Sequence, residues 1–69
     1  MTRIKELRMN AGLSQSGLAK ALNIHQTAVS QWETGRTYPD MSVLLSVADY
    51  FDVSLDYLVG RSDRPKRPE

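Results

Sequence analysis

The stretch GLSQSGLAKALNIHQTAVSQWETG, residues 12–35, has the pattern of two short amphipathic helices joined by a tight turn. Apolar residues recur at spacings of three and four on each side of Asn23, as they do on the buried face of a helix. Asn tolerates the left-handed backbone conformation that such a turn needs. Ser14 is a suitable N-cap, because its hydroxyl can accept a hydrogen bond from a free backbone amide. We therefore predict one helix over 15–22 and another over 26–34.

The second of these helices has a polar face without charge. At about 100° per residue, five neutral side chains fall within an arc of about 140°. A solvated helix face normally carries Lys and Glu, so the choice of residues needs an explanation. Neutral donors and acceptors match base edges in the major groove of DNA, where Gln pairs with adenine and Ser or Thr contacts several bases. A face that is only solvated is the competing interpretation. The face consists of Gln26, Thr27, Ser30, Gln31 and Thr34.

Helical periodicity continues through the rest of the chain, with a cap or a breaker about every dozen residues. It predicts further helices over 3–11, 41–51 and 55–59. The predicted fold class is therefore all-α, with five helices in one domain over 1–60. The charged, Pro-containing residues 61–69 are expected to form a mobile tail. The helix over 41–51 is expected to bury Met41, Leu44, Val47, Ala48 and Phe51.

Composition excludes several classes of protein. The 69 residues form one domain at most, and 41% hydrophobic and 25% charged residues are typical of a globular domain. The absence of Cys excludes disulfides and the common zinc sites. No apolar run has membrane-spanning length and no signal peptide is evident, so we expect a cytoplasmic protein without a membrane partner. Since no set of catalytic groups is evident, we predict no enzyme, metal, cofactor or small-molecule ligand.

The spacing of the two central helices is that of a helix-turn-helix. Small and apolar residues occur where the helices must cross closely or anchor in a core. Together with RIKELR, GLSQSGLAKALNI, VSQWETGRTYPD and LDYLVG, this spacing resembles the phage-repressor, Cro and Xre-like family of DNA-binding domains. The resemblance covers residues 3–60 and implies a five-helix, lambda-repressor-like fold whose second and third helices form the helix-turn-helix. The spaced residues are Gln15, Ala19, Asn23, Val29 and Trp32.

The resemblance also implies a function, which is sequence-specific binding of double-stranded DNA in transcriptional regulation. Because the family often has Asn before Gly35, Thr34 departs from its pattern. Arg8 and Glu33 correspond to a partly buried ion pair with a structural role. The residues implied in base readout are Gln26, Thr27, Ser30 and Gln31. Those implied in phosphate contacts are Ser14, Gln15, Thr34, Gly35, Arg36 and Tyr38.

We predict that the protein acts as a homodimer, most simply as a repressor. A single domain that reads about four or five base pairs cannot specify one genomic site, whereas two copies with half-sites about 34 Å apart can. One alternative is an antitoxin-like regulator that also binds a protein partner, and another is a protein-interaction module without DNA binding. In the family the dimer forms through the end of the domain, which implies the candidates Tyr50, Val53, Tyr57 and Val59.

Overall fold

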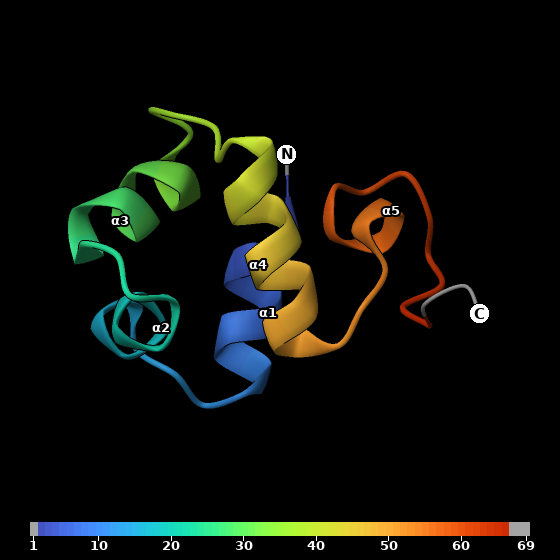
Figure 1. Ribbon diagram of the computed structural model, residues 1–69, viewed down its shortest axis with the longest axis horizontal. Helices are drawn as coiled ribbons and strands as arrows, with labels where there is room; N and C mark the ends of the chain where they lie inside the picture. Colours follow the sequence, from blue (N-terminus) through green and yellow to red (C-terminus); the bar gives the residue numbers. More distant parts are fainter. Residues whose placement is uncertain (1, 67–69) are drawn as a thin grey trace.

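The computed structural model describes residues 2–66, which form five helices without any strand (Figure 1). This confirms the all-α fold class for the described residues. The three middle helices have the predicted bounds, while the first is one residue shorter at each end and the last is one residue shorter. Met1 and residues 67–69, the end of the predicted tail, lie outside the described residues. In chain order the helices are α1 (Ile4–Asn10), α2 (Gln15–Leu22), α3 (Gln26–Thr34), α4 (Met41–Phe51) and α5 (Leu55–Leu58).

Three helices begin at a side chain that caps them. The hydroxyl of Ser14 accepts a hydrogen bond from the third residue of α2 at 2.9 Å. The carboxylate of Asp40 and the hydroxyl of Ser54 each accept one at 3.0 Å at the starts of α4 and α5. Such bonds satisfy backbone donors that have no partner within the helix. The helix starts are therefore encoded locally.

Left-handed residues end the three middle helices. Asn23 has φ 58° after α2, and Gly35 has φ 80° after α3. Asp52 takes the same conformation after α4, with φ 55°. Asp is one of the few residue types with a side chain that tolerates this region. Each of these residues turns the chain sharply into the next element.

Helix α4 lies in the middle of the molecule. Figure 1 shows it in front of α1, with α2 and α3 on one side and α5 on the other. All five helices contribute buried apolar side chains, so the helix pair α2–α3 rests on a shared core. None of the helices in the described part of the chain combines the length and apolar character needed to cross a membrane. The buried residues are Ile4, Leu18, Ala19, Val29, Leu44, Val47, Ala48, Val53 and Leu58.

The prediction that Met41 is buried is wrong. Its side chain is 58% exposed, although it shares a helical face with Leu44 and Ala48, which are buried. Met41 is the first residue of α4, so its side chain lies at the outer end of the helix, beyond the core. Helical periodicity identifies the direction of a side chain around the axis but not its position along the core.

The described part of the predicted tail has fixed partners in the fold. The guanidinium of Arg3 donates to the carbonyl of Tyr57 at 2.8 Å and to the carboxylate of Asp63 at 3.0 Å. The backbone amide of Ser54 donates to the carbonyl of Pro65 at 2.9 Å. The described chain after α5 is thus folded back onto α1 and α5, and the mobility of residues 61–69 stays a prediction.

Candidate nucleic-acid interface

The turn between α2 and α3 holds the two helices in a fixed crossing. The backbone amide of Ile24 donates to the carbonyl of Ala19 at 2.9 Å, directly after the left-handed Asn23. Ala19 is 2% exposed, and its small side chain allows the helices to approach closely. Val29 anchors α3 and is completely buried. The start of α3 is therefore presented by a rigid two-helix unit.

The uncharged polar face of α3 is available for contacts outside the chain. Gln26 and Thr27, in the first turn, are exposed, and Ser30 and Gln31 are partly exposed. Within residues 2–66 none of these four side chains makes a hydrogen bond. The structure therefore brings the four predicted base-reading residues together on one face with their donors and acceptors unused.

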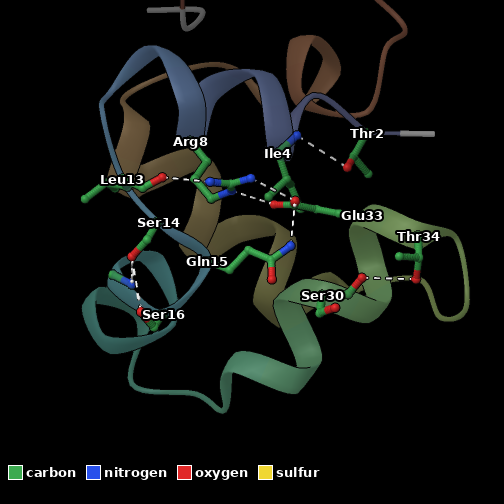
Figure 2. A network of polar contacts seen from close by, with 11 residues as sticks. Thr2, Ile4, Arg8, Leu13, Ser14, Gln15, Ser16, Ser30, Glu33 and Thr34 are labelled. Carbon is green, nitrogen blue, oxygen red and sulfur yellow. Dashed lines mark hydrogen bonds and ion pairs between the residues drawn. The ribbon is translucent and has the colours of Figure 1, made fainter.

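Thr34 differs from the other polar residues of α3. Its hydroxyl donates to the carbonyl of Ser30 at 3.1 Å (Figure 2). It also approaches the carbonyl of Gln31 at 3.3 Å. The hydroxyl proton is thus used inside the helix, and only the oxygen lone pairs remain. A phosphate requires a donor, so in this arrangement the backbone near Thr34 is a better phosphate ligand than its side chain.

An ion pair behind the interface connects α1 to α3. Figure 2 shows Arg8 between Glu33 and Leu13. Its guanidinium donates to both carboxylate oxygens of Glu33, at 2.7 and 3.0 Å, and to the carbonyl of Leu13 at 2.7 Å. The side chains of Arg8 and Glu33 are only 12% and 4% exposed. This geometry agrees with the structural role that the resemblance implies for the pair.

The surroundings of this ion pair favour both charges. Burial of Glu33 acts to raise its pKa, but hydrogen bonds from Arg8 and Gln15 and the charges of Arg8 and Lys5 outweigh it, so the pKa is lowered. The hydrogen bond to Glu33 is the main cause of a raised pKa at Arg8. Both groups are therefore ionised at neutral pH, and the pair stays closed.

Gln15 has a second role that the sequence did not reveal. Its side-chain amide donates to the carboxylate of Glu33 at 3.0 Å (Figure 2). The other amide hydrogen remains for a ligand, because a primary amide has two. Gln15 thus joins the start of α2 to the ion pair. Sequence spacing did not show this contact, because 18 positions separate the two residues.

The other predicted phosphate ligands lie at two places. Ser14 is exposed at the start of α2, where free backbone amides and the helix dipole favour an anion. Gly35, Arg36 and Tyr38 are exposed in the connection after α3. The backbone of this connection is held in place, because the amide of Arg36 donates to the carbonyl of Gln31 at 2.9 Å. The two places flank the polar face of α3 in the chain.

The candidate dimer residues do not form a uniform surface. Tyr50 is 47% exposed, and Tyr57 and Val59 are partly buried. The choice of Val53 as a dimer candidate needs correction. Its side chain is only 6% exposed and belongs to the core between α4 and α5. It has little surface to offer to a second chain. The resemblance implied Val53 only through its place near the end of the domain, and here the residue follows the left-handed Asp52 and packs into the core.

Comparison with known proteins points to one family. A model of the helix-turn-helix family matches residues 4–58, from the start of α1 to the end of α5. The HTH-type transcriptional regulator ImmR of Bacillus subtilis is 37% identical over 67 residues, 97% of this chain and 53% of that protein. The HTH-type transcriptional activator BcrR of Enterococcus faecalis is 37% identical over 57 residues, 83% of this chain and 28% of that protein.

A phage protein is also similar. The repressor protein C2 of Salmonella phage P22 is 33% identical over 57 residues, which are 83% of this chain and 26% of that protein. The chain therefore spans about half or less of the length of these three relatives. One of them is named an activator and another a repressor, so similarity alone does not give the direction of regulation.

Proposed function

Because the chain belongs to the phage-repressor-like helix-turn-helix family, we propose that it binds double-stranded DNA sequence-specifically and regulates transcription. The observation that carries this proposal is the polar face of α3, which has unused donors and acceptors and no charge. The base edges in the major groove of DNA offer hydrogen-bond partners to such a face. We propose no enzymatic activity, and a cytoplasmic location beside the DNA.

In this proposal α3 enters the major groove and reads bases from its first two turns. Gln26 and Thr27 meet the bases first, and Ser30 and Gln31 follow one turn later. A Gln side chain can donate to and accept from adenine at the same time. Each such bidentate contact contributes about 1–3 kcal/mol of discrimination against a wrong base. Gln26 and Gln31 are thus the main specificity residues.

Phosphate contacts hold α3 in register. The start of α2, with Ser14 and the free hydrogen of Gln15, binds one phosphate, and Gly35, Arg36 and Tyr38 bind another. Thr34 lies beside the second phosphate, and its contribution comes from the backbone. The contact of Gln15 with Glu33 positions the first of these ligands. Phosphate contacts set orientation but carry little sequence information.

We further propose a homodimer that acts as a repressor. Occupation of a promoter is sufficient for repression, whereas activation also needs a contact with the transcription machinery. Two copies related by a two-fold axis would read half-sites about 34 Å apart. Tyr50 supplies the most exposed apolar surface among the dimer candidates, and Tyr57 and Val59 supply less.

Selection of binding sites from random duplex DNA tests this function. The expected result is a two-fold symmetric site with half-sites about one helical turn apart. Gln26→Ala should then relax one base position by about 1–3 kcal/mol. Arg36→Ala is the matched comparison and should weaken all sequences alike. A protein that enriches no site and shows no salt-sensitive binding would fit the protein-interaction alternative instead.

A further inference from the structure

A hollow separates α1 from the connection between α3 and α4. Its volume is about 840 Å³, which lies within the range of small-molecule sites in proteins. We name it the α1–loop groove. It lies at the end of α3, where Trp32 and Thr34 are part of its lining. Its lining includes Lys5, Met9, Trp32, Arg36, Tyr38 and Pro39.

The groove has an unusually apolar and aromatic wall for an open surface. Met9 is 60% exposed and Tyr38 is 57% exposed, although both are large apolar side chains. Trp32 lies beside them, partly buried and packed against the core. Aromatic rings and a thioether are favourable partners for a planar aromatic ligand. The wall therefore fits a ring better than a flexible polar molecule.

The side chains at the groove have a net positive charge. Lys5 and Arg36 are exposed, and neither side chain has a hydrogen bond or ion pair with the described residues. The carboxylate of Glu33 already accepts from Arg8 and Gln15. The other acid of the lining, Glu6, accepts a hydrogen bond from the hydroxyl of α5 residue Tyr57 at 3.4 Å. This bond leaves the charge of Glu6 in place, because a neutral hydroxyl does not cancel it. Arg8, Lys5 and Arg36 together carry +3 against −2 for the two acids, which leaves +1, so an anion is the better complement of this rim.

We propose that the α1–loop groove binds a small aromatic anion, with the ring on Met9, Trp32 and Tyr38 and the acidic group near Lys5 and Arg36. Because Arg36 and Tyr38 also belong to the proposed phosphate contacts, such a ligand competes with DNA. This second part rests on the proposed function. By thermodynamic linkage, DNA lowers the affinity for the ligand by the same factor. The ligand would act as an inducer.

Three probes that share an indole ring test the groove. Indole-3-acetate is negatively charged, indole-3-acetamide is neutral and tryptamine is positively charged. Titration into the ¹⁵N-labelled protein should shift the NMR signals of the Trp32 side chain and the Gly35 amide. We expect the acetate to bind about threefold more tightly than the acetamide, as one exposed charge contact provides, and tryptamine to bind least. Equal affinities, shifts elsewhere or no saturable shift would overturn the proposal.

A matched pair of variants locates the charge contact. Lys5→Met removes the charge but keeps much of the chain length, and Lys20→Met does the same on α2, away from the groove lining. Both residues are exposed, so both variants should fold. Lys5→Met should lower the affinity for indole-3-acetate about threefold, to that of the acetamide, while Lys20→Met leaves it unchanged. Equal effects of the two variants would contradict the assigned site.

A DNA titration with and without indole-3-acetate separates the two proposals. Weaker DNA binding in the presence of the probe, with less weakening in Lys5→Met, supports competition. If the probe binds the groove but the protein binds no DNA, the proposed function fails and the ligand site stands. If DNA binds but the probe does not, the ligand site fails alone. If DNA and indole-3-acetate bind without affecting each other, the proposed competition is wrong.

Discussion

Two arginines at opposite ends of α1 each form an ion pair with a carboxylate, but the two pairs lie in very different surroundings. Arg8 holds α1 to α3 through Glu33, and their side chains are 12% and 4% exposed. Arg3 holds the start of α1 to the segment after α5 through Asp63, whose side chain is completely exposed. Both pairs have short nitrogen–oxygen distances, 2.7 and 3.0 Å.

The difference lies in the solvent around each pair. Water screens an exposed ion pair and offers its partners alternative contacts, so such pairs contribute little. Removal of one partner from a buried pair leaves a charge without solvent or counter-charge, which is strongly destabilising. The packing of α1 against α3 should therefore depend on Arg8 far more than the C-terminal end depends on its contact with Asp63.

The largest effect is expected for Arg8→Met. Among the described residues it leaves the nearly buried carboxylate of Glu33 with a hydrogen bond from Gln15 and the more distant charge of Lys5, so the free energy of unfolding should fall by about 3 kcal/mol. Urea unfolding followed by circular dichroism measures this. The double variant Arg8→Met/Glu33→Met removes both charges and should recover part of the loss. If the free energy of unfolding of Arg8→Met lay within about 0.5 kcal/mol of that of the unchanged protein, the ion pair would contribute little to stability.

The pH dependence of stability should sharpen the same comparison. The folded pKa of Glu33 is lowered from an ordinary value of 4.5. Its ionisation therefore stabilises the fold fully above the unfolded pKa, and this contribution is lost as the pH falls through the lower, folded pKa. The stability difference between the unchanged protein and Glu33→Gln should shrink in acid. Unfolding free energies measured between pH 7 and pH 3 would contradict this if the difference stayed constant.

A smaller effect is expected at the other arginine. Asp63→Asn should leave the urea midpoint unchanged, because the carboxylate is fully exposed. Arg3→Met should cost more than Asp63→Asn, since it also removes the hydrogen bond to the carbonyl of Tyr57 and the contact with its ring, 4.3 Å from the guanidinium carbon. It should still cost less than Arg8→Met. An Arg3→Met variant as unstable as Arg8→Met would break the comparison.

The two regions also differ in how far the sequence predicts them. The bounds of α2 and α3 follow from local signals, such as the cap Ser14 and the turn residue Asn23. The contacts of Arg3 join residues 54 to 60 positions apart, and no local pattern shows them. The α1–loop groove is also invisible in the sequence, since its walls come from two separate segments. Local periodicity likewise misplaced Met41, and the resemblance implied a dimer surface at Val53, because the exposure of both depends on where the core ends.

The central claim is that the polar face of α3 contacts DNA while the C-terminal end does not. NMR titration of the ¹⁵N-labelled protein with a duplex obtained by site selection tests it most directly. The largest shifts are predicted at Gln26, Thr27, Ser30 and Gln31 and at the start of α2. Smaller shifts are expected in the segment after α5. Shifts confined to α4 and α5, or no shifts with any duplex, would contradict the claim.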